Sequence, residues 1–113
     1  MPYVEMVTTK SINETQKKAL SGAFGQMIEV FPGKTEKWLM VSVRGDAFMT
    51  FAGEPGDAAM VTISLFGRGD AQAYARMTDG VCRLLSDTLG LPPERIYIKY
   101  EEIAHWGWNG GNF

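Results

Sequence analysis

The feature that most restricts the fold is an internal correspondence between the two halves of the chain, at an offset of 58 residues. Segment 36–39 (EKWL) corresponds to segment 94–97 (ERIY), and Met27 corresponds to Leu85. Each half reads as strand, helix, strand, the pattern of a βαβ unit with a right-handed crossover. Two such units predict an α/β fold, an α+β two-layer sandwich, in which one four-stranded mixed sheet carries both helices on one face. The 113 residues suit a single domain, residues 1–113, with repeats at approximately 2–57 and 58–113.

The first half predicts one helix between two strands. Residues 3–8 alternate loosely between apolar and polar side chains and predict a strand. Ser11 and Asn13 are both candidate N-caps of the helix that follows, and Pro32–Gly33 ends it. Its buried face is predicted from apolar residues at three- and four-residue spacing: Leu20, Phe24, Met27, Ile28 and Phe31. Residues 38–43 predict the second strand.

The second half repeats this order after an irregular stretch. Residues 45–57 predict a loop or hairpin around a short strand at 48–51. Residues 59–66 predict a strand, and Gly67–Asp70 a turn that ends in a candidate helix cap. The second amphipathic helix is predicted from Tyr74, Met77, Val81, Leu84, Leu85 and Leu89, and it is closed by Gly90 and Pro92. Residues 96–100 predict the last strand, and the tail 104–113 contains two tryptophans and three glycines.

Composition excludes several classes of protein. Hydrophobic residues make up 45% and charged residues 21%, as in globular domains, and the net charge of -2 gives no electrostatic reason to expect a nucleic acid partner. Cys82 is the only cysteine, so no internal disulfide can form. No secretory signal and no apolar run long enough for a bilayer are visible, so no membrane partner is expected. We expect a cytoplasmic protein; secretion without a signal peptide would leave no mark in the sequence.

The predicted strands suggest an oligomer. They are apolar on both sides, because the following residues cannot all face the helices along with their alternating neighbours: Val4, Met6, Leu39, Val41, Ile63 and Leu65. Two helices cover only one face, and sheets with parallel strands usually have both faces covered. The predicted cover is another copy of the chain.

Conventional catalytic arrangements are scarce. His105 is the single histidine, and no cluster of His, Cys and carboxylates has metal-ligand spacing. Gly67–Asp70 lies where a phosphate-binding loop would lie but lacks either glycine-rich nucleotide motif.

Position 2 offers a different kind of base. Removal of Met1, which methionine aminopeptidases perform when the next residue is small, would expose the secondary amine of Pro2. An ordinary terminal amine has a pKa of about 7.7–8.0, and burial among apolar side chains lowers it toward neutrality, where a general base is most useful. Considered alone, a proline at the start of a strand is more often without a catalytic role. If Met1 stays in place, Pro2 is an amide and cannot act as a base.

Several segments, spread over essentially the whole chain, together resemble the macrophage migration inhibitory factor branch of the tautomerase superfamily. They are Met1–Pro2, Pro32–Lys34, Phe48–Gly53, Ser64–Gly67, Arg95–Ile98 and Trp106–Asn109. The resemblance implies a homotrimer of subunits built from two βαβ repeats. It also implies a cofactor-independent keto–enol tautomerase, an isomerase similar to phenylpyruvate tautomerase, that acts on a small aromatic α-keto acid with Pro2 as the catalytic base.

The resemblance also suggests a role for each substrate-binding residue. Lys34 would pair with the substrate carboxylate or enolate oxygen, and the backbone N–H of Phe66 would donate to the carboxylate. Tyr97 would come from the neighbouring subunit. Trp106 and Trp108 would cover the aromatic ring; Tyr3 and Met40 would also line the pocket. Without the resemblance, Lys34 reads as a solvated lysine near a helix end, Phe66 and Tyr97 as packing residues, and the tryptophans as packing or interface anchors.

Departures from the family pattern limit the transfer. Lys99 stands where the better-known members have a neutral amide, which would favour a more anionic substrate, and Trp106 replaces a smaller aliphatic residue. The Cys-x-x-Cys pair of the vertebrate cytokines is absent, and Ser11–Asn13 lacks the arginine linked to receptor binding there, although Asp46 is present. A cytokine-like signalling or binding protein with a vestigial tautomerase pocket is therefore the alternative function.

Overall fold

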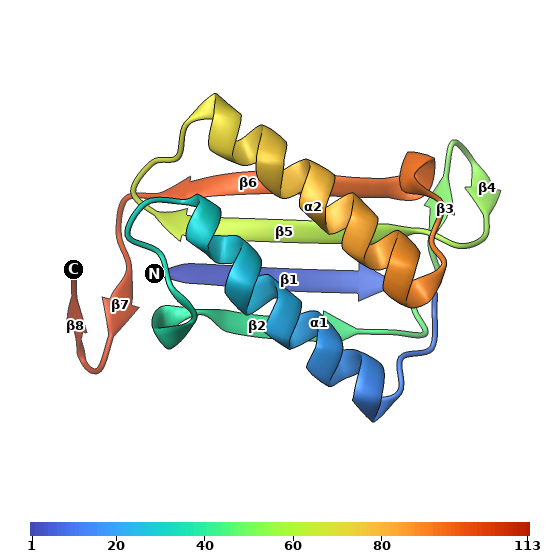
Figure 1. The fold of residues 1–113 in the computed structure, drawn as a ribbon, viewed down its shortest axis with the longest axis horizontal. Coiled ribbons are helices and arrows are strands. Elements are labelled where there is room, and N and C mark those ends of the chain that lie inside the picture. Colours follow the sequence, from blue (N-terminus) through green and yellow to red (C-terminus); the bar gives the residue numbers. More distant parts are fainter.

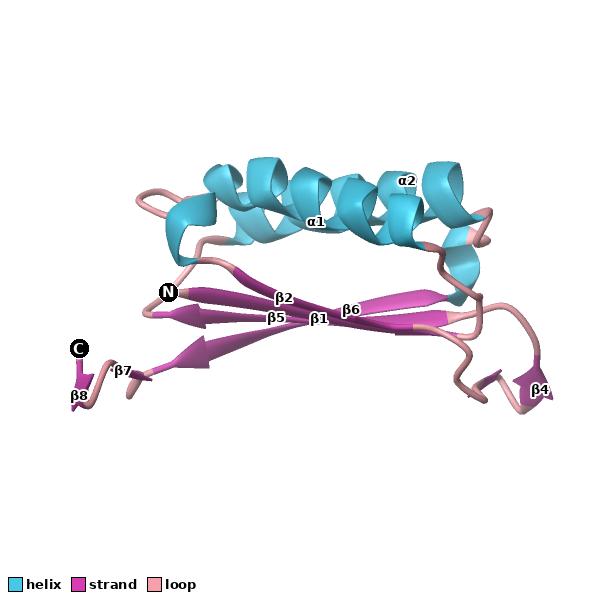
Figure 2. Ribbon diagram, turned by 90° about the horizontal axis from the view of Figure 1, so that it is seen from below, coloured by secondary structure: helices cyan, strands magenta, loops and turns pink.

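The computed structural model describes residues 1–113 as two layers (Figures 1 and 2). Helices α1 (Glu14–Met27) and α2 (Ala71–Leu89) lie side by side on one face of a four-stranded sheet and leave the other face open. The sheet contains β1 (Pro2–Thr8), β2 (Met40–Arg44), β5 (Ala59–Phe66) and β6 (Ile96–Ile103), in the order β2-β1-β5-β6. Neither helix has the length and apolar character needed to cross a membrane.

The sheet is mixed, as predicted. Within each half of the chain the two strands are parallel: β1 with β2, and β5 with β6. The halves meet through the antiparallel pair β1–β5, in which Pro2 lies opposite Leu65 and Thr8 lies opposite Ala59. The start of β1 therefore lies beside the end of β5, and this pairing determines which residues can surround Pro2.

The core lies between the sheet and the helices. It contains 17 buried residues, to which α1 contributes Leu20 and Phe24, and α2 contributes Met77, Val81 and Leu85. These residues follow the helical spacing read from the sequence. Asp70 caps α2 as predicted, because its carboxylate accepts a hydrogen bond from the backbone N–H of Ala73 at 2.7 Å.

Several predicted boundaries were wrong. The predicted strand 38–43 begins instead with the 3₁₀ turn η2 (Glu36–Trp38), and β2 starts only at Met40. Helix α1 ends at Met27 and continues as the 3₁₀ turn η1 (Ile28–Val30) before Pro32 is reached. The last strand extends to Ile103, beyond the predicted end at residue 100, because its backbone stays paired with β5 as far as Phe66, which lies opposite Ile103.

The irregular stretch 45–57 contains a small hairpin, one of the two predicted alternatives, and its first strand covers only part of the predicted 48–51. Strands β3 (Thr50–Phe51) and β4 (Glu54–Pro55) pair through a two-residue turn at Ala52 and Gly53. Both turn residues have positive φ values, 54° and 79°, as expected of the tight turn that matches the twist of a hairpin.

A second hairpin forms the tail. Strands β7 (Gly107–Trp108) and β8 (Gly111–Asn112) project beyond the end of β6, on the side of the open sheet face (Figures 1 and 2). This hairpin lies near the N-terminus, whereas the β3–β4 hairpin lies at the opposite end of the sheet.

The expectation of a second apolar sheet face was wrong, because the apolar strand residues share the face under the helices and their alternating neighbours on the other face are mixed. Val4 lies opposite Ile63, and Pro2 lies opposite Leu65. The alternate β1 residues Pro2, Val4 and Met6 are buried beneath the helices. The open face is mixed and includes Tyr3, Glu5 and Thr62. The expectation of a trimer therefore depends on the family resemblance, not on an apolar open face.

Asn13, and not Ser11, is the N-cap of α1. Its side chain accepts from the Gln16 backbone N–H at 2.8 Å, and the Gln16 side chain accepts from the Asn13 N–H at 3.0 Å, which completes a capping box. We expect Asn13→Ala to lower the free energy of unfolding by about 1 kcal/mol, measured by urea denaturation. Thr15→Ala, at an exposed position in the same turn that makes no side-chain hydrogen bond, should change it by no more than about 0.5 kcal/mol. Equal losses in the two variants would contradict the assignment of the cap.

Candidate active site

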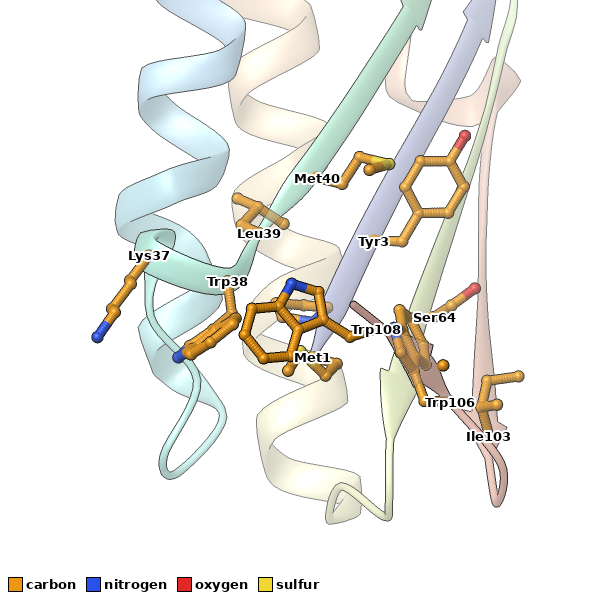
Figure 3. Close-up of a pocket in the computed structure, with 12 residues that line it drawn as sticks. Met1, Tyr3, Lys37, Trp38, Leu39, Met40, Ser64, Ile103, Trp106 and Trp108 are labelled. Atoms are coloured by element: carbon orange, nitrogen blue, oxygen red, sulfur yellow. The ribbon is translucent and has the colours of Figure 1, made fainter. Parts of the chain in front are cut away.

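A pocket of about 770 Å³ opens at the end of the sheet where β1 starts (Figure 3). Of its 12 lining residues, 8 are hydrophobic. The chain reaches it from four directions, through the N-terminus, the segment from η2 to the start of β2, Ser64 near the end of β5, and the segment from Ile103 to Trp108. This convergence follows from the sheet order, because the start of β1 lies between the start of β2 and the end of β5.

Pro2 is buried in the pocket wall, and Met1 occupies the space next to it. The Met1 carbonyl oxygen accepts a hydrogen bond from the Phe66 backbone N–H at 2.9 Å. The ammonium of Lys34 donates to the Phe66 carbonyl oxygen, also at 2.9 Å. Lys34 and Phe66 therefore contact each other, and both belong to the surroundings of the chain terminus.

The terminal amine is in an environment that favours its neutral form. Burial lowers the pKa of the Met1 amine below its usual value of 8.0, and the positive charge of Lys34 lowers it further. Desolvation disfavours an ammonium ion, and a second nearby cation disfavours it as well. Loss of Met1 would place the terminal nitrogen one residue further into the same wall of the pocket.

Aromatic rings form one side of the pocket. Trp108 meets Trp38 edge to face, with ring centroids 5.0 Å apart, and Figure 3 shows both rings beside Met1. Phe113 stacks on Trp108 at 6.1 Å and packs against Phe66 at 5.8 Å. These contacts hold the tail hairpin over the pocket, and Trp106 adds a further lining ring.

The structure brings together most of the residues selected from the sequence. Pro2, Tyr3, Trp106 and Trp108 line the pocket, and so does Met40. Lys34 and Phe66 are not among the lining residues, but they are joined to Met1 by the hydrogen bonds and charge described above.

Tyr97 and Lys99 are not part of this pocket within one chain. Pro2 lies beside Leu65, and Leu65 beside Glu102, whereas Tyr97 lies opposite Met60 near the start of β6. The five-residue step along β6 from Tyr97 to Glu102 corresponds to about 16 Å. Both side chains are on the open face of the sheet, and 62% of the Tyr97 surface is exposed. At this distance Tyr97 cannot contact a molecule bound next to Pro2 of its own chain. Lys99 is nearer, about 10 Å along β6 from Glu102, and its ammonium lies 3.9 Å from the Glu101 carboxylate, which accepts a hydrogen bond from the pocket residue Ser64.

Sequence reasoning missed part of the lining. Lys37, Trp38 and Leu39 line the pocket, and so do Ser64 and Ile103. Trp38 is the first residue of the predicted strand 38–43, and no pocket role was predicted for it. The parallel pairing of the first half contained the signal, because Tyr3 lies opposite Met40 and the residues just before β2 must then lie beside the chain terminus.

Potential metal ligands are not clustered. No group of three or more His, Cys, Asp or Glu side chains is arranged to hold an ion. His105, the one histidine, is exposed. The chemical groups that the pocket does bring together are a terminal amine, a lysine ammonium, one backbone N–H and several aromatic rings.

A sequence profile of the family described as "Macrophage migration inhibitory factor (MIF)" matches residues 1–113. The chain belongs to this family. The MIF of Meriones unguiculatus is 32% identical over 113 residues, covering 96% of both chains. The MIF of Rattus norvegicus is 36% identical over 93 residues, covering 78% of both chains.

Solved structures of MIF proteins share the fold. The crystal structure of MIF2 from Leishmania major has a TM-score of 0.93 and 29% identity, and the match covers 100% of this chain and 97% of that one. The structure of the MIF homologue from Prochlorococcus marinus has a TM-score of 0.83 and 27% identity, with 98% of both chains covered. The two-layer fold with its four-stranded mixed sheet is therefore that of MIF proteins, and membership of this family suggests isomerase activity.

Proposed function

We propose that this MIF family member is a cofactor-independent keto–enol tautomerase that acts on aromatic α-keto acids such as phenylpyruvate. The observation that carries the proposal is the position of Pro2, buried at the wall of an apolar pocket, with Lys34 near the terminal amine. After Met1 is removed, the Pro2 nitrogen is a secondary amine with a neighbouring cation, on a residue buried in an apolar pocket wall. These are the conditions under which an amine stays neutral near pH 7 and can accept a proton.

Removal of Met1 would also free a binding group. The Phe66 N–H donates to the Met1 carbonyl oxygen, and it loses this partner when Met1 is cleaved. A substrate carboxylate oxygen can take the same position, since backbone N–H groups at the turn before a helix suit anions. The Lys34 ammonium donates a hydrogen bond to the Phe66 carbonyl oxygen. Lys34 would add the positive charge that pairs with the substrate carboxylate or with the enolate oxygen.

The reaction then follows from these groups. The Pro2 nitrogen removes a proton from the carbon next to the keto group, and the electron pair of the C–H bond becomes part of the enolate. Lys34 stabilises the negative oxygen, and the proton held by Pro2 returns to that oxygen to give the enol. The tryptophan rings at 38, 106 and 108 supply an apolar surface for the aromatic ring of the substrate.

The site proposed here is shared between subunits. Because Tyr97 lies about 16 Å along the sheet from Pro2, it can complete a pocket only in a neighbouring copy of the chain. We infer a homotrimer in which each open sheet face brings Tyr97 and Lys99 to the Pro2 of another subunit. Light scattering should report three subunits, and a stable, active monomer would contradict this assembly.

The direct test is enol formation from phenylpyruvate by protein whose mass shows loss of Met1, with no metal or cofactor added. We expect a saturable rate above that of buffer, followed by the absorbance of the enol. The rate should be unchanged by a metal chelator. Processed, trimeric protein that does not exceed the buffer rate would refute the proposal and would favour the signalling alternative.

Lys34 provides a variant with a smaller effect. Lys34→Met retains an unbranched side chain but removes the charge. We expect kcat/KM for phenylpyruvate to fall by about 10- to 100-fold, because a charge-assisted hydrogen bond contributes about 1.5–3 kcal/mol. Lys18→Met, on the exposed surface of α1 and without an ion pair, is the matched control and should match the unsubstituted protein. Similar kinetics in the two variants would exclude Lys34 from the site.

The pH dependence supplies an independent prediction. The base must be neutral, so kcat/KM should fall on the acid side with a midpoint at the pKa of the Pro2 amine. Burial and the charge of Lys34 lower the pKa of the terminal amine in this pocket, so the midpoint should lie below the usual range of about 7.7–8.0. Lys34→Met removes a positive charge, which should raise that pKa and move the midpoint to higher pH. A midpoint that stays in place, or moves to lower pH, would contradict this description.

A further inference from the structure

The end of the sheet opposite the pocket contains a tightly connected group of side chains around the β3–β4 hairpin. It consists of Phe51 in β3, the hairpin itself, Arg95 at the end of the 3₁₀ turn η3 (Pro93–Arg95), and Tyr97 in β6. Figure 1 shows the hairpin beyond the start of β6, far from the chain termini. None of these residues lines the pocket of its own chain.

Phe51 is the aromatic contact of Tyr97. Their ring centroids are 5.0 Å apart with an interplanar angle of 53°, a favourable tilted arrangement. The Tyr97 hydroxyl makes no hydrogen bond within the chain, and the Tyr97 residue is largely exposed. Contact with Phe51 therefore restricts the direction in which the Tyr97 ring projects from the open face.

Arg95 fixes Phe51 and the hairpin. Its Nε donates to the Asp57 carbonyl oxygen at 2.6 Å, and one terminal nitrogen donates to the Glu54 carbonyl oxygen at 3.0 Å. The guanidinium also lies over the Phe51 ring, 5.6 Å from its centroid. Arg95 forms no ion pair with a carboxylate. Its planar set of donors is used for backbone carbonyls and one ring, which a lysine would satisfy less well.

We propose that Arg95 and Phe51 are positioning residues that hold Tyr97 in the orientation in which it enters the neighbouring subunit's active site. The inference rests on the proposed function, in which Tyr97 completes the pocket around Pro2 of another copy. Arg95 binds two carbonyl groups in and beside the hairpin and so restricts its position. The hairpin positions the Phe51 ring, and contact with this ring restricts the orientation of the Tyr97 ring. Displacement of a substrate-contacting group by as little as 1 Å can lower a rate by about 100-fold, so a defect at Arg95 is expected to reach a site that it does not touch.

The test is a double-mutant cycle with phenylpyruvate as substrate and trimer formation verified for each variant. We expect Phe51→Ala and Arg95→Met each to lower kcat/KM by about 10- to 100-fold when Tyr97 is present. In the Tyr97→Ala background, which has already lost the ring, the same substitutions should have little further effect, because interacting residues are non-additive. Phe51→Tyr, which keeps the ring, should retain activity.

Controls separate positioning from general stability. Arg83→Met, which removes an exposed arginine paired with Asp79 on α2, should behave like the unsubstituted protein. If Phe51→Ala does not assemble, Phe51→Leu keeps apolar volume without the ring and takes its place in the cycle. Equal losses with and without Tyr97 would overturn the proposal, and so would full activity in both Phe51→Ala and Arg95→Met.

The result also distinguishes this inference from the proposed function. If Pro2→Gly loses activity while Tyr97→Ala keeps it, the positioning role is wrong and the tautomerase assignment stands. If the unsubstituted, processed trimer forms no enol at all, the tautomerase assignment itself fails and this inference fails with it.

Discussion

Replacement of Pro2 by glycine is expected to lower kcat for phenylpyruvate by about 100- to 10,000-fold, the usual contribution of a positioned general base. Glycine is small, so Met1 should still be removed and a terminal amine should remain. That amine is no longer held inside a ring, however, and it can rotate about the bond to Cα, whereas the proline ring fixes the direction of the nitrogen. The ring is also part of the buried wall, and glycine would leave that space unfilled.

Two measurements make this result interpretable. Mass spectrometry must show that Met1 is absent from both proteins, and light scattering must show the same assembly. The loss should appear in kcat more than in KM, because Lys34 and the Phe66 N–H still bind the carboxylate. Turnover within a few-fold of the unsubstituted protein would show that Pro2 is not the base.

The second large effect is a recovery of activity on mixing. Pro2→Gly subunits lack the base but retain Tyr97, and Tyr97→Ala subunits retain the base but lack the phenol. If each site takes Pro2 from one subunit and Tyr97 from the next, each pure variant has only defective sites. Random mixing in equal amounts should restore about a quarter of the sites, those in which a Tyr97→Ala subunit meets a Pro2→Gly neighbour across the heterologous interface of a ring.

The mixing experiment depends on Tyr97→Ala being strongly impaired by itself, which is measured first. Subunits are exchanged by partial denaturation and refolding, and the recovered activity should scale with the product of the two fractions. Activity that only averages the two pure variants would contradict a site shared between subunits. A mixture of unsubstituted and Pro2→Gly protein processed in the same way serves as the control for refolding losses.

The sequence predicted the architecture because the repeat and the helical periodicity are both local signals. The structure confirms that Leu20 and Phe24 are buried in the core and that Asp70 caps α2, as the sequence predicted. The end of β6 was missed for a local reason as well. Its last residues include Glu101 and Glu102, and two charged residues after an apolar segment suggest that a strand has ended. Glu102 has hydrogen-bond partners outside β6: the Tyr74 hydroxyl and the Gly69 N–H donate to its carboxylate and hold its pKa below the usual value.

The candidate site was less accessible to sequence reasoning, because it depends on which strands pair and in which direction. Lys37 and Trp38 reach the pocket only because β2 runs parallel to β1. The separation of Tyr97 from Pro2 follows from the antiparallel pairing of β1 with β5, a contact between the halves that no local pattern reveals. The mixed open face was misjudged for a related reason, since register alone decides that Val4 and Ile63 point to the same side.

The measurement that tests the central claim most directly compares two forms of the same unsubstituted chain, one with Met1 removed and one in which its removal has been prevented. Both are verified by mass and by assembly, and both are assayed with phenylpyruvate. In the unprocessed form Pro2 is an amide, Met1 fills part of the pocket, and the Phe66 N–H is occupied. We predict enol formation by the processed form and none above the buffer rate by the other; equal rates would contradict catalysis by the Pro2 amine.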